Sequence, residues 1–156
     1  MDRHTCRIVV VRALYEIDFR KFDAIDDQIL DEIITYAIDP TKEFELPINW
    51  ESYECNEENI NFIKLTIKAI VNNLEEIDST ISGGLQNYTI DRLSYVDRAI
   101  IRLATYEMLK TDLAKQIAIN EALEITKEYS NLDDGMQVKF NNRLLDNISK
   151  GIPNEQ

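Results

Sequence analysis

The feature that most constrains the fold of this chain is the helical spacing of apolar residues in its last third, residues 91–151. Three segments there carry apolar residues three and four positions apart, which places them on one side of an α-helix. We call the apolar side of each helix its apolar stripe. No single helix can bury its stripe alone, so the three must pack against one another or against the N-terminal half. The stripes are Val96, Ile100, Leu103, Ala104 and Met108; Ala118, Ala122, Ile125 and Tyr129; and Val138, Leu145 and Ile148, with Asn141 as a polar member.

The N-terminal half carries similar patterns, which predict helices over residues 5–22, 26–37 and 57–77. In the first, the helical period outweighs the strand preference of the β-branched run 8–11. Asp39-Pro40 should end the second helix, and the pair Gly83-Gly84 should mark a later break. The face expected to point inward in the first helix comprises Ile8, Val11, Tyr15, Phe19 and Phe22.

These segments predict an all-α fold, a compact bundle of about six or seven helices, in a single domain over residues 1–156. Residues 41–55 are the least regular part, because Pro47 is incompatible with a simple helix there. Gly151, followed by Pro153, is the expected end signal of the last helix. No pair of strands is apparent in the pattern.

Composition indicates a globular cytoplasmic protein. The chain is 44% hydrophobic and 29% charged, as is usual for such proteins. It has no apolar run near the ~18 residues that a membrane span needs, and no signal peptide is apparent. Cys6 and Cys55 are far apart and belong to no motif, which fits a reducing compartment and small filling roles.

The net charge of −12 is unevenly distributed. Residues 1–22 hold five bases against three acids, whereas residues 23–62 hold twelve acids against Lys42 alone. Exposed charges more than ~10 Å apart are largely screened at ordinary salt. The mildly basic N-terminal block could therefore still attract a nucleic-acid backbone.

The motifs of common enzyme classes are missing from the sequence. His4 is the only histidine, so no Ser-His-Asp arrangement, HExxH or di-iron ExxH pair exists. The glycines do not form a phosphate-binding loop, and neither cysteine has neighbours suited to zinc. We expect no enzymatic activity, no catalytic residues, no metal and no cofactor.

The basic and aromatic residues allow two interpretations each. Arg3 and Arg7 stand one helical turn apart, so they suit either one phosphate strand or a solvated terminus. Phe140 lies beside Lys139 and off the apolar stripe. It suits either a base-stacking surface or the core, with Leu144 and Ile148.

Two further groups lie in the predicted helix that begins near residue 95. Ser94-x-x-Asp97 precedes an apolar run and fits a helix N-cap. Arg98 and Arg102 are four residues apart, near Asp91 and Glu107. They indicate a salt-bridged solvent face or a brace between helices.

Four runs of the sequence resemble the NusB family of bacterial transcription antitermination factors. They are RALYEIDF (12–19), VDRAIIRLATYEM (96–108), AINEALEITKEY (118–129) and KFNNRLLD (139–146). The resemblance implies a two-part helical fold and a non-enzymatic factor that acts with NusE, the tenth small-subunit ribosomal protein. It implies binding to boxA RNA of nascent ribosomal RNA, association with RNA polymerase and suppression of premature termination. A homodimer of the free protein is a further state that the resemblance allows.

The resemblance also implies site residues. The positions that match RNA contacts are Arg3, His4, Arg7, Lys139, Phe140 and Asn142, and those that match the NusE-binding surface are Tyr15 and Asp97. The chain departs from the usual pattern at Thr5 and Cys6, where further basic residues are expected. It also departs at Asn141, which replaces an aliphatic residue, and at Arg143, which replaces a glycine. Arg143 either adds a phosphate contact or obstructs close backbone approach.

Two other functions are compatible with the same fold. The small number of basic residues in 1–22 and the acidic segment 23–62 favour an alternative. It is a helical protein-interaction module with little RNA affinity. NusB-like domains also occur in ribosomal RNA methyltransferases, but the chain ends soon after residue 151, and we expect no methyl-donor domain.

Overall fold

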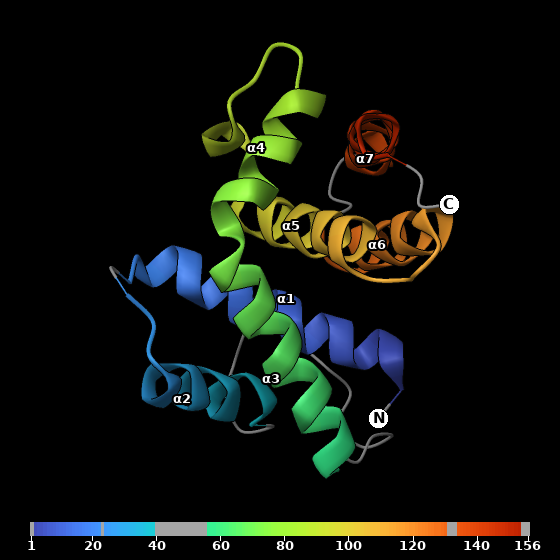
Figure 1. Ribbon diagram of the computed structural model, residues 1–156. Coiled ribbons are helices and arrows are strands. Elements are labelled where there is room, and N and C mark those ends of the chain that lie inside the picture. Colours follow the sequence, from blue (N-terminus) through green and yellow to red (C-terminus); the bar gives the residue numbers. More distant parts are fainter. Residues whose placement is uncertain (1, 23, 40–55, 131–133, 154–156) are drawn as a thin grey trace. The chain divides into compact units, whose positions relative to one another are not determined.

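The computed structural model describes residues 2–22, 24–39, 56–130 and 134–153 (Figure 1). Within these ranges the chain forms seven α-helices and one short 3-10 helix, with no strand, so the all-α prediction is confirmed. The predictions for residues 41–55 and for Cys55 fall outside the described ranges. The elements are α1 (Arg3–Arg20), α2 (Asp27–Ile38), α3 (Glu57–Asn72), α4 (Leu74–Gly84), η2 (Ile90–Arg92), α5 (Tyr95–Lys110), α6 (Lys115–Tyr129) and α7 (Met136–Gly151).

The chain divides into two compact units, an N-terminal unit of Met1–Asn72 and a C-terminal unit of Asn73–Gln156. The N-terminal unit contains α1, α2 and α3, and the C-terminal unit contains α4 to α7. The single domain expected over residues 1–156 stays a prediction.

Helix α1 begins earlier than its apolar pattern indicated, because Asp2 caps it. The Thr5 backbone N–H donates to Asp2 Oδ1 at 2.8 Å, which satisfies a donor at the helix start. This hydrogen bonding from Thr5 holds the pKa of the Asp2 carboxyl below its ordinary value. Lys21, in the left-handed conformation with φ 53°, ends the helix.

The buried part of α1 includes the β-branched run 8–11. Every residue from Thr5 to Leu14 is buried, so the run 8–11 lies in helical rather than strand conformation inside the protein. Cys6 fills buried space there, as expected. The expectation that Phe19 faces the core is wrong, since 57% of its surface is exposed.

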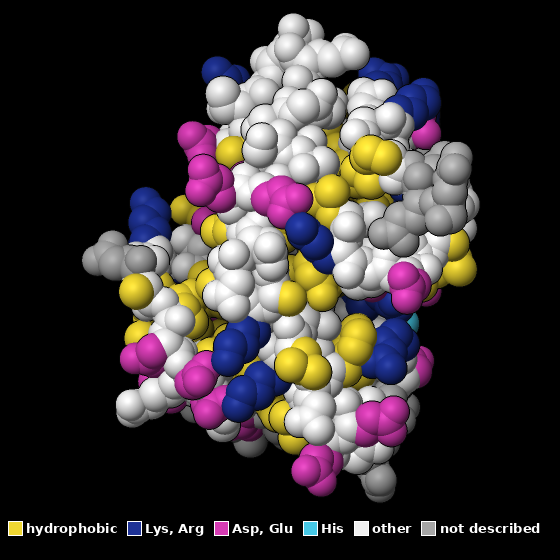
Figure 2. All heavy atoms as spheres, in the orientation of Figure 1, with side chains coloured by type: hydrophobic (Ala, Val, Ile, Leu, Met, Phe, Trp, Pro, Cys, Tyr) yellow, Lys and Arg dark blue, Asp and Glu magenta, His cyan; other side chains and the backbone are white. Residues whose placement is uncertain are grey.

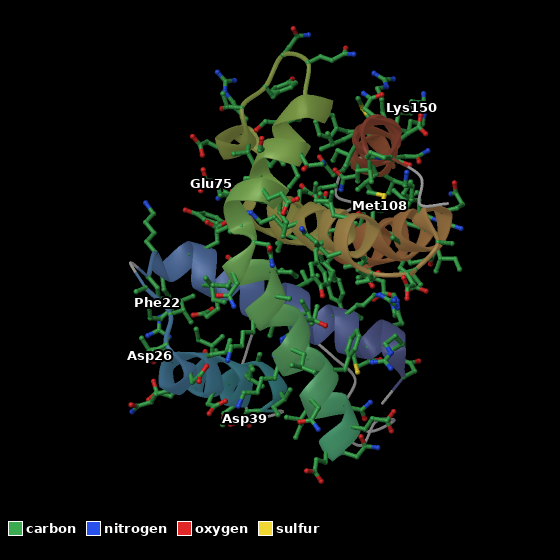
Figure 3. All side chains as sticks on the ribbon, in the orientation of Figure 1. Phe22, Asp26, Asp39, Glu75, Met108 and Lys150 are labelled. Atoms are coloured by element: carbon green, nitrogen blue, oxygen red, sulfur yellow. The ribbon has the colours of Figure 1, made fainter. Side chains whose placement is uncertain are left out.

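Helices α2 and α3 both contact α1, and charged pairs connect α2 with α3. Asp26 caps α2, and Asp39 follows its last turn (Figure 3). Lys64 pairs with Asp31 at 2.6 Å, and Lys68 pairs with Asp27 at 3.0 Å. These pairs raise the pKa of Lys64 and lower that of Asp27. Basic and acidic side chains lie side by side over α2 and α3 (Figure 2).

The predicted helix over residues 57–77 is two helices. Helix α3 ends at Asn72 and α4 begins at Leu74, with Asn73 at φ −118° and ψ 19°. Asparagine favours helix ends, because its side chain competes for backbone hydrogen bonds. The apolar stripe continues through Ile70 and Ile77, both fully buried, so periodicity alone did not indicate the interruption.

In the C-terminal unit, α4, α5 and α6 all contact α7 (Figure 1). The expected Gly83-Gly84 break is the C-terminal end of α4. Helix α7 runs through Gly151, one residue further than expected. Lys115, at the start of α6, donates from Nζ to the carbonyl oxygens of Ser149 and Ile152 at 3.3 and 2.5 Å, a favourable position for a cation.

The two arginines of α5, Arg98 and Arg102, lie in different surroundings. Arg102 forms a two-pronged ion pair with Asp78 of α4, with both N–O distances 2.9 Å. This confirms the expected brace between helices. The solvent-face alternative is wrong for Arg98, which is buried, donates to the Ile90 carbonyl oxygen at 3.4 Å and lies 4.9 Å from the Tyr95 ring.

Substitution of Gly84 by alanine tests the close contact between α4 and α7. A Cβ at Gly84 would lie 2.8 Å from Ile148 Cγ1 and 3.2 Å from its backbone nitrogen. We expect Gly84→Ala to lower the free energy of unfolding by about 1–3 kcal/mol, because the helices must separate. Urea unfolding followed by circular dichroism measures this.

Gly83→Ala is the matched control. Its Cβ would meet no atom within 4 Å, so we expect a stabilisation of about 0.4–1 kcal/mol. Equal changes in the two variants would contradict the role assigned to Gly84.

Candidate nucleic-acid and partner interface

The first candidate group lies on the first two turns of α1, in the N-terminal unit. Arg3 is exposed, and its guanidinium carbon lies 3.8 Å from the centre of the Phe62 ring on α3. This cation–π contact holds the side chain in place while its edge remains accessible. His4 is half-buried, whereas only 7% of Arg7 is exposed. The exposed positive charge of this group is therefore concentrated at Arg3.

Tyr15 lies further along α1, where the helix emerges from its buried section. Its ring stacks on that of Phe19, with centroids 6.0 Å apart and planes 7° apart. Tyr15 is half-buried and Phe19 is exposed. Stacked aromatic rings that are partly exposed offer a large, rigid contact area, which is common in protein interfaces.

The second candidate RNA group lies near the start of α7, in the C-terminal unit. Lys139 and Asn142 are exposed, and Phe140 is half-buried. Leu144 and Ile148, its proposed companions in a core role, are 3% and 1% exposed. Phe140 therefore lies at the edge of the core, with part of its ring accessible. Basic side chains lie over α7 on the face drawn in Figure 2.

Tyr88 is not among the site residues predicted from the sequence, but it contacts one of them. Its ring meets that of Phe140 edge to face, with centroids 5.9 Å apart and planes 86° apart. Tyr88 precedes η2 and is 52% exposed. The only signal in the sequence was an aromatic residue within a polar segment, QNYT, which is the kind of place where loops carry binding residues.

Asp97 lies in the first turn of α5, which Ser94 caps, and joins a buried hydrogen-bond network. The Asp97 backbone N–H donates to Ser94 Oγ at 3.1 Å, which confirms the capping prediction. Its carboxylate accepts from Ser94 Oγ at 2.7 Å, from Ser130 Oγ at 2.8 Å and from Asn141 Nδ2 at 3.1 Å. Only 4% of its surface is exposed, so Asp97 mainly holds Ser94, Ser130 and Asn141 in position.

Asn141 is the centre of this network, which we call the Asn141 network. Its Nδ2 also donates to Thr126 Oγ1 at 3.1 Å, and its Oδ1 accepts from Gln137 Nε2 at 3.0 Å. Asn141 is fully buried, as the apolar stripe indicated. Hydrogen bonds to α5 and α6 satisfy its amide nitrogen and one from Gln137 of α7 satisfies its oxygen, so a polar residue is accommodated in the core.

The residues that the structure describes contain neither a candidate metal site nor a helix suited to cross a membrane. Among them, no group of three or more histidine, cysteine, aspartate or glutamate side chains is placed to hold a metal ion. None of the described helices has the combination of length and apolar character that crossing a bilayer requires.

Substitution of Asn141 tests the network. Asn141→Ala removes the donors to Asp97 and Thr126, so we expect the free energy of unfolding to fall by about 1–3 kcal/mol. Its neighbour Asn142 is exposed, and Asn142→Ala should change the value by no more than about 0.5 kcal/mol. Thermal and urea unfolding measure both, and equal effects would contradict a structural role for Asn141.

A family model and a sequence relative both match this chain to NusB. The model of the NusB family matches residues 4–150. The transcription antitermination protein NusB of Clostridium botulinum (strain Loch Maree / Type A3) is 35% identical over 131 residues, which cover 83% of this chain and 89% of that protein.

Solved NusB structures have a similar fold. The structure of T. maritima NusB has a TM-score of 0.75 and 33% identity, covering 97% of this chain and 93% of its own. A structure of antitermination factors NusB and NusE in complex with dsRNA has a TM-score of 0.70 and 24% identity, covering 97% and 99%, and at that identity it shows the fold alone. The family match over almost the whole chain, together with these relatives, shows that this chain belongs to the NusB family.

Proposed function

We propose that this protein acts as a transcription antitermination factor that binds boxA RNA of nascent ribosomal RNA together with NusE. The bound complex associates with RNA polymerase and suppresses premature termination. The observation that carries the RNA-binding role is Phe140, half-buried at the edge of the core, on the same turn of α7 as the exposed Lys139 and Asn142. An accessible aromatic ring beside a cation and an amide matches the needs of single-stranded RNA.

Each unit contributes RNA contacts in this proposal. Arg3, His4 and Arg7 supply them from α1 in the N-terminal unit, and Lys139, Phe140 and Asn142 supply them from α7 in the C-terminal unit. Only 7% of Arg7 is exposed, whereas Arg3 is exposed. Arg3 therefore makes most of the phosphate contact within the first group. One solved structure that shares this fold contains NusB and NusE in complex with dsRNA, which supports both classes of partner.

NusE binding is assigned to Tyr15 and Asp97. The stacked Tyr15 and Phe19 rings supply an aromatic contact area on α1. Asp97 supports the surface at the start of α5 by fixing Ser94, since little of its own carboxylate is exposed.

A protein-interaction module with little RNA affinity is the second candidate. The burial of Arg7 and the net charge of −12 favour it, because both reduce the attraction of an RNA backbone. The two functions differ in whether RNA binds once NusE is present.

RNA binding is tested by fluorescence anisotropy with a labelled boxA-like RNA. Because the chain is acidic, we expect weak binding by the protein alone and much tighter binding with NusE. Equal affinity with and without NusE would contradict this expectation, and no binding in either case would favour the interaction module.

Arg3→Ala should weaken binding and reduce the slope of log K against log salt by about 0.7, the value for one phosphate contact on a single strand. Arg20→Ala is the matched control, because Arg20 also lies on α1 and over an aromatic ring, that of Phe22. The same change of slope in both variants would exclude a specific contact by Arg3.

The partner surface is tested by Tyr15→Ala. We expect a loss of at least about 1 kcal/mol in NusE affinity, since aromatic residues at interface centres commonly carry such energies. Tyr36→Ala, at an exposed tyrosine on α2, is the control. Isothermal titration calorimetry measures both, and unchanged NusE affinity in Tyr15→Ala would remove Tyr15 from the surface.

A further inference from the structure

A pocket of about 130 Å³ lies beside the Tyr88–Phe140 pair. We call it the Tyr88 pocket, and it lies wholly within the C-terminal unit. Its lining comes from the segment after α4 and from one side of α7. The residues that matter for its chemistry are Asn87, Tyr88, Phe140, Arg143, Leu144 and Asn147.

The size of the pocket fits one six-membered ring. A cavity of ~150 Å³ in another protein is known to hold benzene, so about 130 Å³ suits a pyrimidine better than a two-ring purine. The Tyr88 and Phe140 rings meet at 86° and form a corner. A flat ring in that corner can stack on one aromatic face and meet the edge of the other.

The wall of the pocket also carries polar groups. Asn147 Nδ2 donates to the Gly84 carbonyl oxygen at 3.5 Å, which positions its amide at the wall. Asn87 contributes a second amide. An amide presents both donors and an acceptor, and the hydrogen-bonding edge of a pyrimidine needs both.

Two arginine side chains lie at or beside the pocket. Arg143 lines it, and Arg92 and Phe140 line a second hollow that also includes Tyr88. Both arginines and Lys139 are exposed. The nearby acid Asp146 is paired with Lys150 at 3.0 Å, near the end of α7 (Figure 3). These cations suit the phosphates on either side of an inserted base.

From this geometry we infer that the Tyr88 pocket binds a single unstacked pyrimidine of RNA, and that Tyr88 is a further RNA-binding residue. The inference rests on the proposed function, because it extends the RNA surface from Phe140 to the segment between α4 and η2. It adds a preference for one class of base at one position of the strand.

The test compares two labelled 12-nucleotide single-stranded RNAs, one rich in uridine and one of adenosine, with NusE present. We expect wild-type protein to prefer the uridine strand. Tyr88→Leu should weaken binding to that strand by roughly 5- to 150-fold, the range for loss of one stacked base. Its binding to the adenosine strand should change by less than about two-fold, because a purine does not use the pocket.

Two further variants make the result specific. Asn147→Phe should fill the pocket and reduce the uridine preference as Tyr88→Leu does. Tyr36→Leu, an exposed tyrosine on α2 in the N-terminal unit, should leave that preference intact. In a strand with 5-iodouridine, photocrosslinking followed by mass spectrometry should modify Tyr88 or Phe140.

The inference is overturned if both pocket variants keep the wild-type uridine preference, or if the crosslinks lie on peptides outside the pocket. It is also overturned if Tyr88→Leu binds RNA as the wild type does in the absence of NusE but no longer binds NusE, since the pocket then serves the protein partner. In each of these three cases the wild type still binds RNA, so the proposed function is not contradicted. If the wild type with NusE binds neither strand, the proposed function and the inference fail together.

Discussion

The Asn141 network is the interaction on which the C-terminal unit depends. A fully buried amide must find partners, because an unsatisfied polar group in a core costs more than the hydrogen bond itself contributes. Asn141 finds them on Asp97 of α5 and on Thr126 of α6. Three helices are thereby held in one rotation and register. The same amide fixes the first turns of α7, where Lys139, Phe140 and Asn142 lie.

The network explains how the most unusual residue of the KFNNRLLD run is accommodated. An aliphatic residue would fill the same space, but it would leave the Asp97 carboxylate without one of its three side-chain donors. Asn141 supplies that donor. The substitution therefore affects the support beneath the proposed RNA surface, whereas Arg143 lies on that surface and lines the Tyr88 pocket.

Charge acts on function here through local arrangement. Acids on α2 are paired with lysines of α3, so part of the acidity in residues 23–62 is neutralised locally. Arg3 is exposed and held against Phe62, while Arg7 is almost fully buried. An acidic protein can in this way present a few well-placed cations, and in the proposed complex NusE would increase their effect by adding contacts to the same RNA.

The sequence by itself determined most of the helical segments, most of their inward faces and the Ser94 cap of α5, because helical periodicity and capping depend on neighbours a few residues away. It also carried the family resemblance. The tertiary structure decided that Arg102 pairs with Asp78, that Arg7 is buried, that Phe19 is exposed and that Tyr88 meets Phe140. It also placed the break at Asn73, across which the apolar period continues unchanged. Contacts between residues far apart in the chain depend on how helices pack, and a local pattern does not encode that packing.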